Sequence, residues 1–391
     1  VGENLHGIRV VKSFVREEKE KEKFNAVSQN IYNDYIKAEK ILAFNSPLMQ
    51  FCMYTCTLLL SWFGAQLIVG SGNNSALGMT TGQLTSMLTY ATRILMSLMM
   101  LSMVFVMITM SKASAERIAE VLEEESDIQN PENPVYTVKD GSVAFRDVIF
   151  SYAKDPNKLC LQDVTIQIPS GATVGIIGGT GSSKSTLVQM IPRLYDATQG
   201  SVEVGGLDVR QYDIETLRNE VSMVLQKNEL FSGTIKDNLR WGNPEATDEE
   251  LIHACQLAQA DDFIRAFPDG YDTHIEQGGT NVSGGQKQRL CIARALLKKP
   301  KILILDDSTS AVDTHTDALI RKAFREEIPE TTKFIIAQRI SSVEDADLIL
   351  VMDGGRIVGR GTHSQLMQES AIYREVYTSQ MKGGTENEQA L

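Results

Sequence analysis

Residues 178–186, GGTGSSKST, lie between an apolar run at 173–177, TVGII, and a stretch of helical character at 187–194, LVQMIPRL. They fit the phosphate-loop pattern G-x-x-x-x-G-K-[ST], except that Ser183 replaces the final Gly. A plain Gly/Ser turn between a strand and a helix is the alternative. The Lys-Ser-Thr ending directly after an apolar strand favours a phosphate site.

The residue types of this loop suit phosphate chemistry. Backbone N–H groups of small residues can wrap a phosphate, and the start of the next helix adds about half a positive charge. We expect Lys184 to reach the β- and γ-phosphates and Ser185 to ligate Mg²⁺. The whole predicted cradle comprises Gly178, Gly179, Thr180, Gly181, Ser182, Ser183, Lys184, Ser185 and Thr186.

An acidic strand end lies far downstream of the loop. The run KILILDD at 301–307 is an apolar strand that ends in Asp306 and Asp307. A carboxylate at the C-terminal end of a strand beside a phosphate loop can hold Mg²⁺ through water, so we assign this role to Asp306. Alone the pattern is weak, because many strands end in an acid. Together with the phosphate loop it predicts one site.

The surroundings of these motifs indicate an α/β domain. Short β-rich runs alternate with helical stretches from Gly141 onward, which predicts a largely parallel buried sheet over residues 141–380. Residues 123–140 are polar, contain two prolines and are predicted to be a linker. The tail 381–391 is predicted to be disordered.

A further motif lies between the two parts of the phosphate site. Residues 282–286, VSGGQ, resemble the signature LSGGQ of ATP-binding-cassette (ABC) proteins, with Val in place of Leu. Other elements of the family occur in the expected order along the chain. Tyr152 in FSY and Gln226 in MVLQ precede the signature, and SAVD at 310–313, which resembles the D-loop, follows it. The resemblance extends over nearly the whole chain.

The resemblance implies ATP and Mg²⁺ as cofactors and a role for each motif. Tyr152 would stack on adenine, and Gln226 would link Mg²⁺ to the transmembrane domain. In the family, the signature opens a helix whose N-terminus faces the ATP of the other subunit, so that two ATP molecules join two nucleotide-binding domains. The signature residues with this role are Ser283, Gly284, Gly285 and Gln286.

The first part of the chain has the composition of a membrane domain. Between Ile41 and Ser111 the only charged residue is Arg93, and the apolar stretches at about 47–70 and 82–110 are long enough to span a bilayer. Eight Lys and Arg precede residue 41 and none lies in the loop at 71–81, which predicts that both ends are cytoplasmic. Buried helices of a soluble core are the alternative. Arg93 could line a substrate path or snorkel from near a helix end.

This part resembles the last third of an exporter-type transmembrane domain. The run ENLHGIRVVKSFVREE at 3–18 is similar to the stretch near the second cytoplasmic coupling region, after the fourth span. The two apolar stretches would then be the fifth and sixth of six spans, within a partial domain over residues 1–122. Since the first residue is Val, we expect the sequence to start inside a longer protein.

Of the three residues expected to act in ATP hydrolysis, Lys184 fits the family pattern and the other two depart from it. Asp307 replaces the usual Glu that activates the attacking water, and Gln338, in FIIAQR, replaces the switch histidine. A lost base slows hydrolysis about 10²–10⁴-fold, and Gln cannot carry a positive charge. Gln277 also departs from an often acidic position. The pattern resembles the degenerate-site subunit of heterodimeric multidrug-type ABC exporters of bacteria.

The sequence therefore predicts half of an ATP-driven exporter in the cytoplasmic membrane, with its nucleotide-binding domain in the cytoplasm. This chain would bind MgATP at a weak site and supply VSGGQ to a different, related subunit. A homodimer with two working sites is the first alternative. A non-transporting ABC ATPase and an importer ATPase are others, and the fused spans disfavour both. Drugs, lipids and peptides remain open as cargo.

Composition limits the remaining possibilities. The chain has 38 basic and 50 acidic residues and a net charge of −12, which argues against nonspecific nucleic-acid binding. Its 42% hydrophobic and 23% charged residues exclude a largely disordered or collagen-like chain. Five Cys in 391 residues do not make a disulfide framework.

Overall fold

The chain divides into two compact units, Val1–Glu125 and Ser126–Leu391. The computed structural model describes residues 2, 5, 7–74, 76, 78–153 and 155–388. The division falls within the linker predicted at 123–140, where the chain is polar and contains two prolines. Each unit is described by itself.

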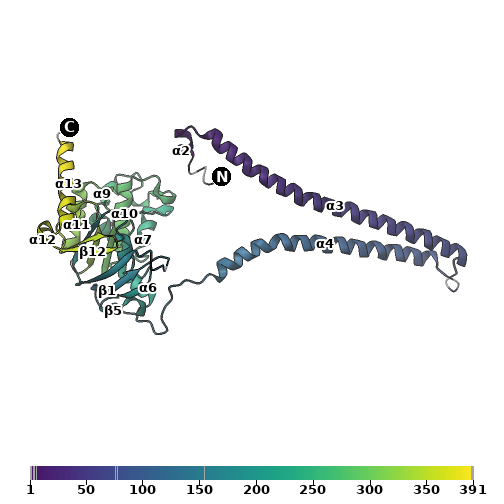
Figure 1. Ribbon diagram of the computed structural model, residues 1–391, viewed down its shortest axis with the longest axis horizontal. Coiled ribbons are helices and arrows are strands. Elements are labelled where there is room, and N and C mark those ends of the chain that lie inside the picture. Colours follow the sequence, from purple (N-terminus) through teal and green to yellow (C-terminus); the bar gives the residue numbers. More distant parts are fainter. Residues whose placement is uncertain are drawn as a thin grey trace. The chain divides into compact units, whose positions relative to one another are not determined.

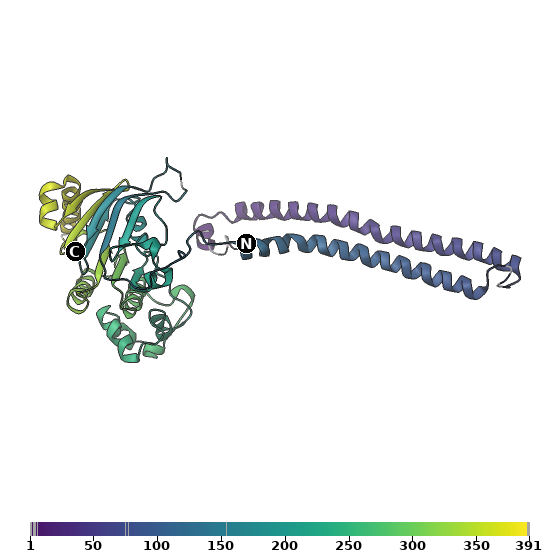
Figure 2. The ribbon, with the colours of Figure 1, turned by 90° about the horizontal axis from the view of Figure 1, so that it is seen from below.

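The first unit is a helical hairpin. Its helices are α2 (Ile8–Ser13), α3 (Glu17–Ser71) and α4 (Thr81–Glu123). Both views show α3 and α4 running side by side in opposite directions (Figures 1 and 2). Helix α3 continues through Pro47 for 55 residues, so its polar first part and the apolar stretch at 47–70 form one helix. Thr80 begins α4 with a capping box, in which its side chain accepts a hydrogen bond from the Gln83 N–H.

Both long helices have the properties of membrane spans. The predicted spans at 47–70 and 82–110 lie within α3 and α4, each of which is long and apolar enough to cross a bilayer. None of the residues of α4, all of which the structure describes, is buried. Large apolar side chains such as Phe105 and Ile108 are therefore exposed along its length. Such continuous apolar surface suits lipid or neighbouring membrane helices.

The second unit contains two main sheets. The larger has the order β12-β11-β3-β10-β9-β6, and all of its strands are parallel except β12. The smaller is antiparallel, with the order β2-β1-β4-β5. The larger sheet consists of β3 (Thr173–Gly178), β6 (Val221–Val224), β9 (Ile302–Asp306), β10 (Thr332–Ile336), β11 (Leu348–Asp353) and β12 (Arg356–Gly361). The smaller consists of β1 (Val143–Phe150), β2 (Leu161–Ile168), β4 (Gln199–Val204) and β5 (Leu207–Asp208).

The antiparallel sheet was not foreseen. The β-rich runs from Gly141 onward were predicted to form one largely parallel sheet, a prediction that did not distinguish β1 from the central strands. The burial patterns differ: β9 and β10 are buried at every position, whereas β1 exposes part of one face. A half-covered strand is typical of antiparallel sheets, and a fully covered one of parallel sheets.

Helices and short elements surround the sheets. The helices are α5 (Lys184–Gln189), α6 (Ile214–Glu220), α7 (Ile235–Arg240), α8 (Asp248–Leu257), α9 (Asp261–Arg265), α10 (Gly284–Leu297), α11 (Thr314–Glu327), α12 (His363–Glu369) and α13 (Ala371–Glu388). A two-stranded ribbon joins β7 (Gly233–Thr234) to β8 (His274–Ile275), and η1 (Val209–Gln211), η2 (Gly270–Asp272), η3 (Gln277–Gly279) and η4 (Ile340–Ser342) are single 3₁₀ turns.

Helix α13 covers most of the tail that was expected to be disordered. It continues to Glu388, and residues 389–391 lie outside the described part of the chain. Tyr373 anchors its first half, because this side chain is fully buried. A helix that begins in the core can propagate into a polar segment, since each added residue gains one backbone hydrogen bond.

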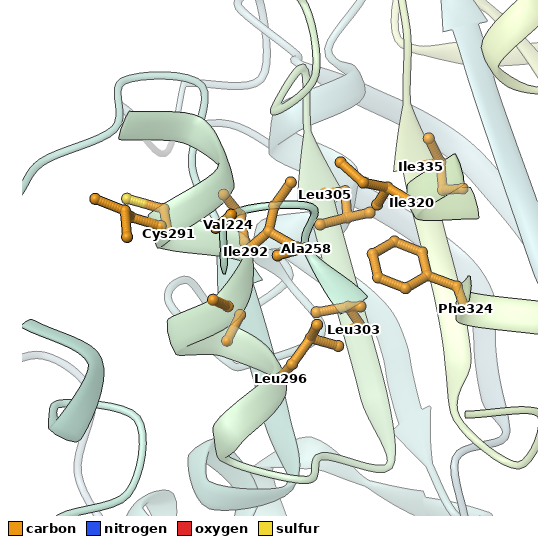
Figure 3. Close-up of a cluster of buried hydrophobic side chains, with 14 of the residues drawn as sticks. Val224, Ala258, Cys291, Ile292, Leu296, Leu303, Leu305, Ile320, Phe324 and Ile335 are labelled. Carbon is orange, nitrogen blue, oxygen red and sulfur yellow. The ribbon is translucent and has the colours of Figure 1, made fainter. Parts of the chain in front are cut away.

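A hydrophobic cluster fixes the sheet against α10 and α11. Figure 3 shows Leu303 and Leu305 of β9 among Ile292 of α10 and Ile320 and Phe324 of α11. All five side chains are at most 2% exposed. This packing holds the strand that ends in Asp306.

We expect Leu303→Ala to lower the free energy of unfolding by about 3 kcal/mol, because it leaves a cavity in a close-packed cluster. Leu319→Ala on α11 is the matched control, since Leu319 is 36% exposed, and it should change stability by less than about 1 kcal/mol. Chemical denaturation of both variants tests this. Equal losses of stability in the two variants would contradict the placement of Leu303 in the core.

Candidate nucleotide site

The parallel register of the large sheet brings three strand ends together. Ile336 of β10 pairs with Ile176 of β3 and with Asp306 of β9. The loops that follow these strands therefore meet at one edge of the sheet, where ligands of α/β folds bind. They surround a cavity of about 540 Å³. Its lining residues are Tyr152, Cys160, Gly178, Gly179, Thr180, Gly181, Ser183, Lys184, Ser185, Thr186, Gln226, Asp306, Asp307, Ile336 and Gln338.

This cavity unites most of the residues predicted for the phosphate site. Ser182 lies behind the lining and is 4% exposed, whereas Cys160 and Ile336 line the cavity without having been predicted. No sequence signal marks Cys160. Ile336 could have been inferred, because it ends the strand before Gln338.

The loop after β3 contains one strained position. Ser183 has φ 70° and ψ 25°, a left-handed conformation that costs a residue with a side chain about 1–2 kcal/mol. The Gly that is usual there would adopt it freely. Gly178 serves a different need, because a Cβ at this position would collide with the Met352 carbonyl oxygen. The backbone at Gly178 thus lies close to Met352 and also lines the cavity.

Lys184 lies across the loop. Its Nζ donates hydrogen bonds to the carbonyl oxygens of Gly178 and Gly179 at 2.9 and 2.8 Å and to Ser182 Oγ at 3.3 Å. Burial lowers the pKa of this amine, and the two carboxylates at the end of β9 oppose the shift. The ammonium group is thereby held where phosphate oxygens would enter the loop.

The two aspartates at the end of β9 are both buried but have different partners. Burial raises the pKa of Asp306, and a hydrogen bond with Ser185 opposes the shift. Burial also raises the pKa of Asp307, while hydrogen bonds from Gln338 and Gln226 oppose it. The Gln338 Nε2 donates to Asp307 Oδ2 at 2.6 Å. The two departures from the family pattern are therefore in direct contact.

The oxygen donors in the cavity fit Mg²⁺. A hydroxyl of Ser185, an amide oxygen of Gln226 and a carboxylate of Asp306 line the same space, and Mg²⁺ prefers such oxygen ligands together with phosphates and water. Among the residues that the structure describes, no cluster of three or more His, Cys, Asp and Glu side chains could hold a metal.

An aromatic cluster flanks the other end of the cavity. The Tyr152 ring meets Phe150 and Tyr195 edge to face, with ring centroids 4.8 and 5.0 Å apart, and its hydroxyl lies 3.1 Å from Thr186 Oγ1. The Tyr152 side chain is 51% exposed, so part of it remains available for a base. The supporting rings, Phe150 and Tyr195, were not predicted, although FSY and RLYD carry them in the sequence.

The signature residues do not line this cavity. Ser283 is the N-cap of α10: its Oγ accepts from the Gln286 N–H at 3.3 Å, and Gln286 Oε1 accepts from the Ser283 N–H at 2.9 Å. Ser283 and Gly284 are exposed. Both belong to a separate helix start that a second molecule could reach.

Side-chain hydrogen bonds connect this helix start to the D-loop. Gln288 donates to Ser310 Oγ at 3.2 Å and accepts from the Ala311 N–H at 3.0 Å. A Cβ at Gly285 would lie 2.8 Å from the Ala311 carbonyl oxygen, so the two segments pack closely. Gln288 was not singled out in the sequence, because it follows the motif rather than belonging to it.

Known proteins resemble both parts of the chain. The family model described as "ABC transporter" matches residues 161–310, and the one described as "ABC transporter transmembrane region" matches residues 1–99. The uncharacterized ABC transporter ATP-binding protein YknU of Bacillus subtilis is 38% identical over 98% of this chain and 64% of its own length. The probable multidrug resistance ABC transporter ATP-binding/permease protein YheI of B. subtilis is 35% identical, over 97% of this chain and 63% of its own length.

A solved structure agrees with the fold as a whole. It is described as a bacterial Atm1-family ABC exporter with ATP bound, has a TM-score of 0.87 and 30% sequence identity, and is matched over 97% of this chain and 65% of its own. The chain thus spans less than two thirds of the length of these relatives.

We expect Ser183→Gly to raise the free energy of unfolding by about 1 kcal/mol, because glycine adopts the left-handed conformation without strain. The matched control is Gly179→Ser, at a position where an added Cβ would meet open space, and it should leave stability nearly unchanged. Thermal unfolding without nucleotide measures both. If Ser183→Gly is less stable than the unchanged chain, the left-handed backbone at Ser183 is not a source of strain.

Proposed function

Because the chain belongs to the ABC transporter family, we propose that it is half of an ATP-driven exporter in the cytoplasmic membrane. The observation that carries this proposal is one cavity that contains Lys184, Ser185, Gln226 and Asp306, in a chain with two membrane-length helices. The similarity to YheI, a probable multidrug resistance transporter, and to an Atm1-family exporter favours export over import. The cargo class, drug, lipid or peptide, stays open.

The residues of the cavity divide the work of binding MgATP. Tyr152 offers a ring for adenine, and the loop 178–186 with Lys184 holds the phosphates. Ser185, Asp306 and Gln226 would hold Mg²⁺, which neutralises charge on the β- and γ-phosphates when bound. All of these groups belong to one domain, so nucleotide binding would not need a second subunit.

We propose further that this site hydrolyses ATP slowly. The Asp307 carboxylate is one methylene shorter than a glutamate and accepts a 2.6 Å hydrogen bond from Gln338, which engages one of its oxygens. A general base must reach its water within hydrogen-bond distance. Gln338 can donate to a γ-phosphate but cannot add a positive charge there. Both features favour retention of ATP over its cleavage.

The exposed start of α10 supports a role at a partner's site. Ser283 and Gly284 lie on the surface, outside the cavity of their own chain. A helix start binds anions through its free N–H groups and its partial positive charge. We propose that VSGGQ completes the ATP site of a different, related subunit, and a homodimer is the alternative. The ATPase rate of the chain alone, compared with the rate after adding such a partner, separates the two.

Asp307→Glu should raise ATP hydrolysis by the chain at least about tenfold, because a positioned base contributes about 10²–10⁴-fold. Phosphate release from the purified chain at saturating MgATP measures this. Asp269→Glu, at an exposed position outside the cavity, is a control with the same chemical change. An unchanged rate in Asp307→Glu would mean that Gln338 or Ser183 limits hydrolysis.

Ser283→Arg should abolish ATP hydrolysis by the assembled transporter while the chain still binds MgATP, since the large cation blocks the helix start but lies outside the cavity. Steady-state ATPase and nucleotide binding are measured on the same preparation. Ser283→Ala, which removes only the cap, should destabilise the chain by about 1 kcal/mol and retain turnover. Full turnover in Ser283→Arg would exclude the proposed role of VSGGQ.

A further inference from the structure

The C-terminal helix contacts the backbone of the loop that carries Gln338. The Gln380 Nε2 of α13 donates to the Gln338 carbonyl oxygen at 2.7 Å, and the Gln380 Oε1 accepts from the Ile340 N–H at 2.9 Å. One side-chain amide thus pairs with an acceptor and a donor two residues apart. A two-point contact restrains the orientation of the loop as well as its distance from α13.

Helix α13 is a fixed support for this contact. Tyr373 is fully buried, and its hydroxyl lies 2.7 Å from His363 Nδ1. Tyr377 packs against the same hydrophobic cluster. Tyr373, Tyr377 and Gln380 are spaced at i, i+4 and i+7, so they share one face of the helix. The buried face of α13 therefore directs Gln380 to the loop.

The loop is also restrained from the side of the cavity. The Ala337 N–H donates to the Ile176 carbonyl oxygen at 3.2 Å, and the Ile340 side chain is 1% exposed. Between these two points, the Gln338 side chain extends to Asp307. The carbonyl group of Gln338 belongs to the segment between the restraints, and Gln380 is its hydrogen-bond donor.

We propose that Gln380 is a positioning residue, which holds the backbone of Gln338 so that its side-chain amide faces the γ-phosphate. This inference rests on the proposed function, in which Gln338 donates a hydrogen bond to that phosphate. ADP lacks the γ-phosphate. Loss of the Gln380 contact therefore weakens the binding of ATP without weakening that of ADP.

The test compares dissociation constants for MgADP and for an ATP analogue with a β,γ-imido bridge, measured on the whole chain in nanodiscs. Gln380→Met keeps the length of the side chain and removes both hydrogen bonds. We expect its affinity for the analogue to fall about threefold to tenfold, because each bond contributes modestly, with MgADP affinity unchanged. Ser379→Ala, at an exposed position of the same helix, should change neither.

Hydrogen exchange at the Ile340 amide provides a second readout. Gln380→Glu keeps an oxygen that can accept from this amide but loses the donor to the Gln338 carbonyl. We expect Gln380→Met to accelerate exchange at Ile340 and Gln380→Glu to keep it slow, while both variants lose affinity for the analogue. A merely structural role of α13 would instead change the affinities for the analogue and for MgADP together.

Gln338→Ala separates failure of this inference from failure of the proposed function. If Gln338→Ala lowers affinity for the analogue relative to MgADP and Gln380→Met does not, Gln380 has no positioning role and the proposed function stands. If Gln338→Ala leaves this ratio unchanged, the proposed role of Gln338 is wrong, and the inference from Gln380 is wrong with it.

Discussion

The parallel pairing of β3, β10 and β9 is the constraint on which the candidate site depends. Because Ile176, Ile336 and Asp306 share one register, the residues that follow them meet at the same edge. Both faces of β9 and β10 are buried, so a slip of one residue would exchange the side chains packed on the two sides of the sheet. Lys184, Asp307 and Gln338 are close for this reason alone, although they lie far apart in the sequence.

Two positions at this edge of the sheet have an unfavourable backbone conformation. Ser183 accepts a left-handed backbone that a glycine would adopt without strain. Asp307 is also left-handed, with φ 50°, and its buried carboxylate accepts from Gln338. Beside these positions, Lys184 Nζ donates to the carbonyl oxygens of Gly178 and Gly179. Under the proposed function, nucleotide binding and hydrolysis would therefore depend on different residues of one site.

The sequence predicted those features that have a fixed local pattern. The loop 178–186, the strand ending in Asp306 and the apolar spans were all recognisable from spacing and composition. Contacts between distant segments were not, because no local rule relates Gln380 to Gln338 or Gln288 to Ser310. The antiparallel sheet was not predicted for a similar reason. Tertiary packing decides which strands pair, whereas the residues of a strand show only that it is extended.

Side-chain hydrogen bonds connect the start of α10 to the end of β9 through the D-loop. Gln288 of α10 bonds to Ser310 Oγ, which in turn donates to the Asp307 carbonyl oxygen at 2.9 Å. The link therefore ends on the backbone of Asp307, whereas the hydrolytic role proposed for that residue would reside in its carboxylate. Replacing the side chain of residue 307 leaves its backbone carbonyl oxygen in place. This oxygen can therefore still accept the hydrogen bond from Ser310 of the D-loop. Under the proposed function, a chain without its own base would accordingly still keep VSGGQ ordered for another subunit.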